Sequence, residues 1–223
     1  MNVHDYAARL PEPEVLRDRC RALAMLEAII SPDWEWRYHS FDAEWSPGVE
    51  MASRRNGSGD EWSIVFAPAG VFIRGFDHEA PMSPVANDNE LWPGLLDGLP
   101  DALREFADEP AFSFDDQLNA TFVLWRTGTD PAWRVGAGIE FPAVGPGRTP
   151  DGSDQLELLC DDGIDAFVAF ATDYYDDLAD LDAGAVAHVF ALRPLTDEIV
   201  AAINPDLTLD DVEEDRATIG YPS

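Results

Sequence analysis

The sequence predicts an α+β fold, in which an antiparallel, meander-rich sheet carries packed helices and the C-terminal third is helical. Tight-turn signals separate three apolar runs between residues 49 and 76, apolar residues recur at helical spacing before them, and helical patterning follows residue 155. Hydrophobic residues make up 46% of the 223 residues, enough for a sizeable core. We expect one domain over residues 1–223, β-rich over 32–141 and helical over 155–218, because the loop over 142–153 is short for a flexible linker.

The N-terminal part predicts a helix followed by a strand. Apolar residues follow helical spacing from Glu14 to Ile30, and Pro32 ends the pattern. Trp34, Trp36 and Tyr38 then alternate with polar residues, which is the period of a half-buried strand. These aromatic side chains could line a site for a sugar or a cation. Aromatic residues at strand spacing more often belong to the core.

The segment from Val49 to Phe76 predicts a three-stranded antiparallel meander. Asn56-Gly57-Ser58-Gly59-Asp60 and Pro68-Ala69-Gly70 are tight-turn sequences, and each stands between two runs rich in β-branched and aromatic residues. Because hairpin ends alternate between the two ends of a sheet, we expect the first turn and Asp77 to lie near opposite ends. The three predicted strands are Val49–Arg55, Trp62–Ala67 and Val71–Phe76.

Further elements follow from the same signals. Pro100 favours a short helix over Asp101–Ala107, and a turn over residues 127–131 predicts a second hairpin. Thr196 and Thr208 are typical helix N-caps, because acids and an apolar run follow each of them. The strands of the second hairpin are predicted at Thr121–Arg126 and Trp133–Phe141, and the C-terminal helices at Ile164–Tyr175, Gly184–Leu192, Thr196–Ile203 and Thr208–Ala217.

Charge and composition limit the classes of partner. The chain has 44 acidic and 14 basic residues, a net charge of −30, and every base is Arg. Such a surface repels nucleic acids and anionic lipids, and it attracts cationic ligands or a basic protein. The alternative is a solubility adaptation to salty cytosol or a GC-rich genome. We expect a cytoplasmic protein with no membrane partner, since no export signal or membrane span is evident, and we expect Cys20 and Cys160 to be reduced, buried thiols.

Several catalytic motifs are missing from the sequence. Without Lys there is no Walker A lysine and no Schiff base with a pyridoxal cofactor. The run from Val135 to Phe141 begins like a dinucleotide fingerprint, but Phe141 stands where the third Gly belongs. No GxSxG, HExxH or Cys/His quartet occurs. We therefore expect no cofactor.

The strongest candidate site is Gly75-Phe76-Asp77-His78-Glu79, where a predicted strand opens into a loop. Its three ionisable side chains are of types that bind metals and transfer protons, and Arg74 could orient a carboxylate. Because adjacent residues of an extended chain point to opposite faces, Asp77 and Glu79 should converge while His78 faces away. The alternative is a strand end at which His78 or Asp77 bonds backbone groups and holds the loop.

Two other segments are weaker candidates. The glycine turn over residues 56–61, next to two arginines, could cradle an anion, although a plain hairpin turn needs the same glycines. The acidic C-terminal third is where we expect contact with a cationic partner, and solvated acids that aid solubility are the alternative. It includes Asp173, Asp176, Asp177, Asp180, Asp182, Asp210, Asp211, Glu213 and Glu214, and the run over 173–182 lacks the EF-hand register.

The segments Asn56-Gly57-Ser58-Gly59-Asp60-Glu61 and Gly75-Phe76-Asp77-His78-Glu79, with Arg193-Pro194-Leu195-Thr196 and a terminal Gly220-Tyr221-Pro222, resemble a family of bacterial proteins with no assigned function. The resemblance implies a bacterial, cytosolic protein and no activity. Our leading hypothesis is a non-enzymatic acidic binding protein, immunity-like or regulatory, that recognises a cationic protein. The alternatives are a metal-assisted hydrolase using Asp77, His78 and Glu79, and a small-molecule binder on the Trp-rich sheet. The candidate binding residues are Arg74, Asp77, His78, Glu79, Trp34 and Trp36.

Overall fold

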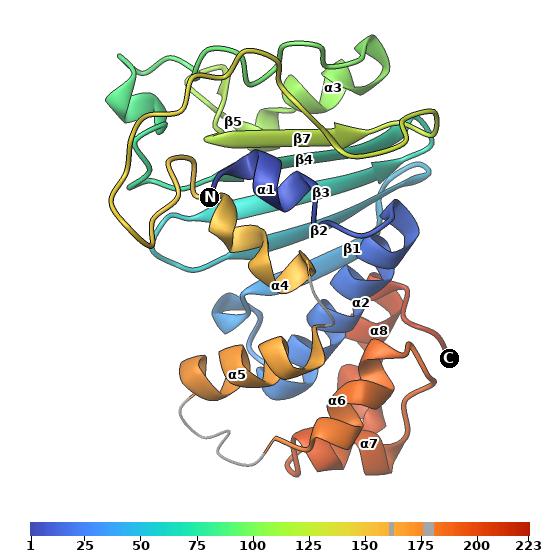
Figure 1. The fold of residues 1–223 in the computed structure, drawn as a ribbon. Coiled ribbons are helices and arrows are strands. Elements are labelled where there is room, and N and C mark those ends of the chain that lie inside the picture. Colours follow the sequence, from blue (N-terminus) through green and yellow to red (C-terminus); the bar gives the residue numbers. More distant parts are fainter. Residues whose placement is uncertain (161–162, 176–180) are drawn as a thin grey trace. The chain divides into compact units, whose positions relative to one another are not determined.

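The computed structural model describes residues 1–160, 163–175 and 181–223 (Figure 1). The chain forms two compact units. The first comprises Met1–Leu10 and Ser53–Glu157, and the second comprises Pro11–Ala52 and Leu158–Ser223. The single domain expected from the sequence, with helices packed on the sheet, stays a prediction.

The strands form a six-stranded antiparallel sheet in the order β1-β2-β3-β4-β7-β8, which confirms the α+β class and the meander. Both tight turns lie where the sequence predicts them, so the meander strands agree with the predicted runs within one residue. A separate two-stranded sheet pairs β5 (Ser113–Phe114) with β6 (Gln117–Leu118). The main-sheet strands are β1 (His39–Ser46), β2 (Val49–Arg55), β3 (Glu61–Ala67), β4 (Gly70–Phe76), β7 (Phe122–Arg126) and β8 (Arg134–Val135).

The register of β3 and β4 places the candidate loop beside the first turn. Glu61 pairs with Phe76 at one end of the two strands, and Ala67 pairs with Gly70 at the other. The chain therefore returns along β4 to the end of the sheet from which β3 started. The expectation that the turn over 56–60 and Asp77 lie near opposite ends is wrong, because two successive hairpins bring the third strand back to the first turn.

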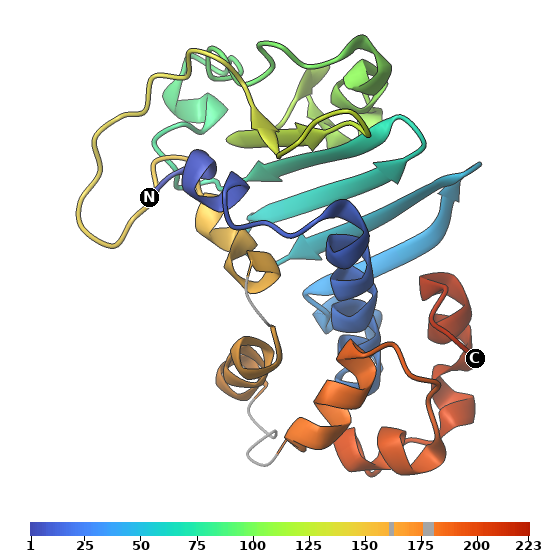
Figure 2. The same cartoon turned by 45° about the vertical axis from the view of Figure 1, so that its right-hand side comes forward.

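The core of the first unit surrounds β3 and β4. Each strand contains five consecutive buried residues, so both of its faces are covered. Phe106 of α3 (Arg104–Ala107) lies against Phe72, with ring centroids 6.3 Å apart, and α1 (Val3–Ala7) contacts β7 and β8. Figure 2 shows the twist of the sheet that contains β3 and β4. The predicted helix over 101–107 is present as a 3-10 turn (Asp101–Leu103) that continues into α3.

The second hairpin is confirmed, but its second strand is much shorter than predicted. Leu124 pairs with Val135 and Trp125 with Arg134, and β8 ends there. The chain then leaves the sheet, because Ala137 N donates a hydrogen bond to Asp97 O. Gly136 permits this path, since a Cβ at that position would lie 1.9 Å from Gly94 O.

The second unit is built around α2 (Pro13–Ile30), whose predicted bounds are confirmed within one residue. Its Glu27 carboxylate is fully buried and accepts hydrogen bonds from Tyr38 N, His39 N and Tyr175 Oη. The helical C-terminal part is confirmed, and Thr196 Oγ1 accepts from Ile199 N as the predicted cap. The C-terminal helices after α4 (Glu157–Cys160) are α5 (Ile164–Tyr174), α6 (Ala183–Phe190), α7 (Asp197–Ile203) and α8 (Glu213–Ile219).

Trp34 and Trp36 do not belong to a strand. They form a 3-10 turn, Trp34–Trp36, and their exposed fractions are 58% and 59%. The strand β1 begins only at His39, where the buried Glu27 carboxylate accepts hydrogen bonds from the backbone N–H groups of Tyr38 and His39. The guanidinium of Arg37 fixes the turn by donating to the carbonyl oxygens of Ser31 and Pro32 and to the Asp215 carboxylate.

Both cysteines are free and buried, as predicted. They lie on α2 and α4, and burial raises the pKa of the Cys20 thiol well above its ordinary value. Among the described residues, no helix is both long enough and apolar enough to cross a membrane.

Candidate functional site

Asp60, Asp77 and His78 come together at one end of the main sheet and form the Asp60–Asp77–His78 cluster. Each residue contributes one potential metal-ligand atom, and these three atoms lie within 4.8 Å of one another. Asp60 is the last residue of the turn between β2 and β3, and the other two residues directly follow β4. The antiparallel register thus joins residues that are 17 and 18 positions apart in the sequence.

Asp60 and His78 are linked by two hydrogen bonds to the same oxygen. His78 Nδ1 lies 2.6 Å from Asp60 Oδ1, and His78 N donates to that oxygen at 3.1 Å. The bond to Asp60 raises the pKa of the His78 ring, whose side chain is 45% exposed. Burial raises the pKa of Asp60, but hydrogen bonds from His78 and Asn56 outweigh it and lower the pKa overall. The imidazole is therefore accessible and held beside an ionised carboxylate.

Asp77 is held between two segments of the first unit. Its N–H donates to Thr121 Oγ1 at 3.2 Å, and its Oδ1 accepts from Glu79 N at 2.8 Å. A Cβ on Gly152 would lie 2.2 Å from Asp77 Cβ, so only glycine fits beside it. Burial raises the pKa of Asp77, the bond from Glu79 N opposes this in part, and the negative charges of Asp60 and Asp154 raise it further. A bound cation would relieve this concentration of negative charge.

Two of the predicted residues do not join the cluster. Glu79 is exposed and contributes its backbone N–H to Asp77, so the expectation that Asp77 and Glu79 converge while His78 faces away is wrong. The bond to Asp60 turns His78 toward the cluster instead. Arg74 is buried and pairs with Glu61, with Nη1 2.6 Å from Oε1, above the ring of Phe112. Burial lowers the pKa of Arg74, and the Glu61 carboxylate opposes this effect.

The glycine turn orients Asp60 through the side chain of Asn56. Asn56 Oδ1 accepts hydrogen bonds from Ser58 N and Asp60 N, both at 3.0 Å. Asn56 Nδ2 donates to the second carboxylate oxygen of Asp60 at 2.7 Å. The N–H groups of Ser58 and Asp60 are therefore not available to an anion. Asp60 was missed as a partner of His78 because the sequence argument placed the two residues at opposite ends of the sheet.

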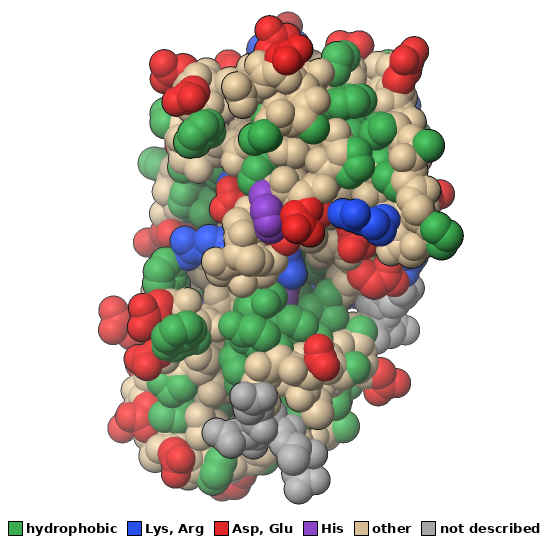
Figure 3. All heavy atoms as spheres, turned by 90° about the vertical axis from the view of Figure 1, so that its left-hand side faces the viewer, with side chains coloured by type: hydrophobic (Ala, Val, Ile, Leu, Met, Phe, Trp, Pro, Cys, Tyr) green, Lys and Arg blue, Asp and Glu red, His purple; other side chains and the backbone are tan. Residues whose placement is uncertain are grey.

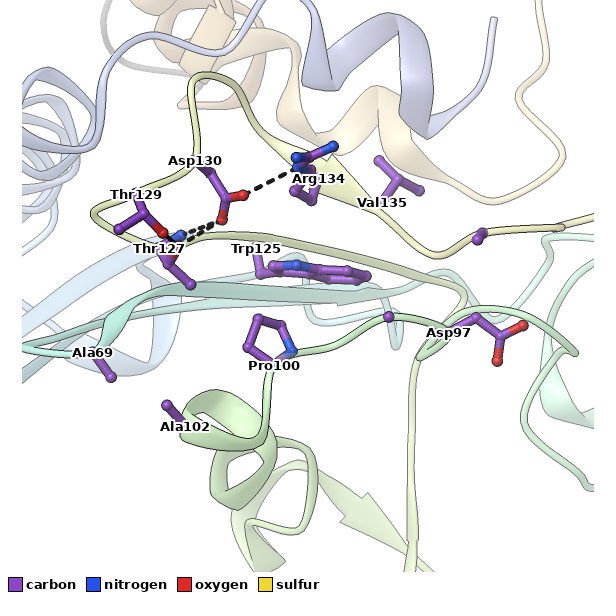
Figure 4. A pocket seen from close by; sticks show the side chains of 12 residues that line it. Ala69, Asp97, Pro100, Ala102, Trp125, Thr127, Thr129, Asp130, Arg134 and Val135 are labelled. Carbon is purple, nitrogen blue, oxygen red and sulfur yellow. Dashed lines mark hydrogen bonds and ion pairs between the residues drawn. The ribbon is translucent and has the colours of Figure 1, made fainter.

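A pocket in the first unit has no counterpart among the sequence predictions. It has a volume of about 640 Å³ and lies between the hairpin of β7 and β8 and the segment around Asp97 and Pro100. Figure 4 shows the indole of Trp125 between the linked Asp130 and Arg134 side chains on one side and Pro100 on the other. Three of its residues, Thr127, Thr129 and Asp130, come from the turn over 127–131, which the sequence predicted only as a hairpin connection.

The exposed tryptophans form a third feature, which we call the Trp34–Trp36 turn. Asp33 and Glu35 are exposed in the same turn, so two indoles alternate with two carboxylates. Among the described residues, only three large hydrophobic side chains are more exposed than these two indoles. They are Met1, Val85 (79% exposed) and Phe114 (71% exposed).

On the face that Figure 3 shows, acidic side chains lie at many separate places and do not gather into one patch. In the C-terminal third, Glu213 pairs with Arg216 at 2.7 Å, and Asp211 accepts from the N–H and hydroxyl of Thr208. Asp210 and Glu214 are exposed. Asp176, Asp177 and Asp180 lie outside the described residues.

Comparison with protein-family models, with curated proteins and with solved structures found no match.

Proposed function

We propose that this protein binds a divalent transition-metal ion through Asp60, Asp77 and His78. The observation that carries the proposal is the convergence of three ligand atoms within 4.8 Å, from two loops that the β3–β4 register brings together. One imidazole and two carboxylates form a mixed nitrogen and oxygen set, which suits Zn²⁺ or Mn²⁺ better than Ca²⁺ or Mg²⁺.

The arrangement also leaves room for chemistry at the metal. Three protein ligands leave at least one coordination position open, and the half-exposed His78 ring places that position within reach of solvent. An open position can activate a water molecule or polarise a bound carbonyl or phosphoryl group. Such a site would support metal-assisted hydrolysis. In this proposal Asp60 replaces Glu79 as the third metal ligand beside Asp77 and His78.

Metal-dependent thermal stabilisation tests the proposal. A ligand that binds only the native state stabilises it by about 2.7 kcal/mol at a concentration of 100 Kd. We expect Mn²⁺ or Zn²⁺ at physiological ionic strength to raise the melting temperature of the wild type. The Asp77→Ala and His78→Ala variants should lose this shift. Calorimetric titration should give one high-affinity site.

Glu79→Gln is the matched control, because it removes an acid from the same loop and leaves all three ligands in place. It should retain the full shift. If the wild type does not respond, or if all variants respond equally, the proposal fails. The cluster then serves only to hold the loop after β4 through the bonds from His78 to Asp60.

We propose as a second function that the Trp34–Trp36 turn recognises a cationic protein, as expected of an immunity-like or regulatory factor. Two exposed indoles beside Asp33 and Glu35 offer aromatic surface for cation–π contact and charges of the matching sign. Trp and Arg dominate the energetics of protein interfaces, and Arg37 holds this turn rigid. The net charge of −30 would accelerate association with a basic partner.

An arginine-rich peptide is the probe for this second function. The double variant Trp34→Ser with Trp36→Ser should weaken binding about tenfold or more, as loss of a central aromatic anchor does. Val85→Ser is the control, because Val85 is 79% exposed and lies outside the turn. If the double variant and the wild type bind the peptide equally, the affinity comes from the net negative charge of the protein. The Trp34–Trp36 turn is then not part of the interface.

A further inference from the structure

Two loops of the first unit each expose a large apolar side chain. Phe114 belongs to the hairpin of β5 and β6, which is separate from the main sheet (Figure 1), and its exposed fraction is 71%. Val85 lies in the loop after β4, with an exposed fraction of 79%. No other large hydrophobic residue among those described is as exposed. Apolar side chains that gather on a surface are typical of interaction sites.

The two loops are in contact with each other. Phe114 pairs with Gln117 across the hairpin, so both side chains point to the same face. Gln117 Nε2 donates a hydrogen bond to Asn89 O at 3.4 Å. Asn89 N in turn donates to Pro84 O at 2.8 Å, which closes the turn that carries Val85. The Phe114 face of the hairpin therefore contacts the turn of Val85. We call the two loops, residues 84–90 and 113–118, the Val85–Phe114 surface.

Both loops also contain strained backbone. Asp115 and Asp116 form the two-residue turn of the hairpin, with φ angles of +50° and +61°. Asp88 and Asn89 have φ angles of +54° and +62°. Two-residue hairpin turns with two positive φ angles favour Asn-Gly, because glycine has no Cβ to clash in this conformation. Exposed apolar side chains and left-handed aspartates both reduce stability, and such features coincide at functional sites.

The Val85–Phe114 surface is acidic. Its two loops carry exposed carboxylates and no basic residue, and none of these carboxylates makes an ion pair with a described residue. They are Asp88, Glu90, Asp115 and Asp116. With a net charge of −30, the chain repels a second copy of itself, nucleic acids and anionic lipids. A partner for this surface must therefore combine apolar side chains with positive charge.

We propose that the Val85–Phe114 surface docks an amphipathic cationic helix of a partner protein. Apolar side chains on one face of such a helix contact Phe114 and Val85, and basic side chains at its edges pair with the four carboxylates. Recognition here requires an apolar face on the partner, which a purely polar arginine-rich peptide lacks. The surface is separate from the Trp34–Trp36 turn, which belongs to the other compact unit, and it shares no residue with the Asp60–Asp77–His78 cluster.

Two peptides of identical leucine and lysine content test the proposal. In the first, all leucines lie on one face of a helix, and in the second the same residues are scrambled. Titration calorimetry should show that the amphipathic peptide binds at least about tenfold more tightly, because only this peptide covers both apolar side chains. The double variant Val85→Ser with Phe114→Ser should lose this difference. Val15→Ser is the matched control, because Val15 is 48% exposed and lies in the other unit, and it should keep the difference.

The hairpin turn gives an independent test. Asp115→Asn with Asp116→Gly introduces the preferred turn sequence, so the melting temperature should rise. The same change removes two carboxylates, so the amphipathic peptide should bind about fivefold more weakly at low salt. A purely structural turn would show the first effect without the second. Equal affinity of the two peptides, equal binding by the Val85 and Phe114 double variant and the wild type, unchanged affinity in the turn variant, or binding of phosphatidylcholine vesicles in place of the peptide would each overturn the proposal.

Discussion

His78 uses a single carboxylate oxygen of Asp60 for both its ring and its backbone N–H. The same residue pair therefore holds the loop after β4 and presents two of the three proposed metal ligands. In the metal-free protein, the pair makes stability depend on pH through the His78 ring.

We predict a pH-dependent loss of stability from this pair. Because the pKa of His78 is raised in the folded state, its stabilisation is fully present below the unfolded value of about 6.5 and is lost as the pH rises through the folded pKa. The difference in free energy of unfolding between the wild type and His78→Gln should therefore shrink from about pH 5 to about pH 9. Urea denaturation in the presence of a chelator measures it, and a difference that grows with pH would contradict the assignment.

Gly152 provides a second test at single-residue resolution. Its φ is +71°, and a Cβ there would also displace Asp77. Gly147 has a similar φ of +78° with open space around it. We predict that Gly147→Ala costs roughly 1–2 kcal/mol of stability through backbone strain alone. Gly152→Ala should cost more and should also remove the metal-dependent melting shift. Retention of that shift would separate Asp77 from the metal site.

At the scale of elements, β4 and β7 meet at a position that only glycine can occupy. Gly75 pairs with Phe122, and a Cβ on Gly75 would lie 1.9 Å from the Phe122 ring. The ring covers the glycine and fills the end of the sheet next to the Asp60–Asp77–His78 cluster. Strand packing and site position therefore depend on the same contact.

We predict that Gly75→Ala destabilises the fold by about 1–3 kcal/mol, because overpacking forces the Phe122 ring to move. Combining it with Phe122→Leu should recover part of this loss, since the smaller side chain frees the space. Gly128→Ala, at a glycine of the same unit with nothing within 4 Å, should change stability little. Additive effects in the double variant, measured by chemical denaturation, would show that the two side chains do not compete for one volume.

The elements that the sequence predicts well are those determined by neighbouring residues. Turn chemistry defined the meander around Asn56–Asp60, and helical periodicity defined α2. The alternation from Trp34 to Tyr38 was misleading, because Arg37 and Glu27 hold that segment through contacts distant in sequence. The pocket beside Trp125 could not be predicted, because its walls join only through tertiary contacts.

The candidate site was predicted in part. Asp77 and His78 stood out because ionisable residues follow a strand, a pattern visible locally. To predict that Asp60 lies near Asp77 and His78, the relative directions of three strands must be known. The expected directions were wrong, so Asp60 was expected at the opposite end of the sheet. Glu79 resembled its neighbours in chemistry, but its exposed side chain is not among the grouped ligands.

At the scale of the whole molecule, charge is the dominant feature. A net charge of −30 on 223 residues produces repulsion between acidic side chains. Folding increases this repulsion because it brings the charges closer together. Most ion pairs described here involve exposed side chains, which contribute little to stability. Salt should therefore act mainly by screening repulsion.

We predict that the urea midpoint rises between 0.01 M and 0.15 M NaCl, as the Debye length falls from about 30 Å to about 8 Å. Neutralising the exposed Asp210 and Glu214 to Asn and Gln should raise stability at low salt and reduce the dependence on salt. A midpoint that falls with salt would mean that attractive pairs outweigh the repulsion, and the acidic surface would then lose its role in attracting a cationic partner.

The burial of Cys20 and Cys160 makes the native protein a convenient host for site-specific labelling. A cysteine introduced at the exposed Glu35 would be its only readily alkylated thiol, so a single dye could be attached without removing either native cysteine. The absence of lysine also leaves the N-terminal amine as the principal target of amine-reactive reagents. Two different fluorophores could thus be placed orthogonally, one at the N-terminus and one in the turn between the two indoles.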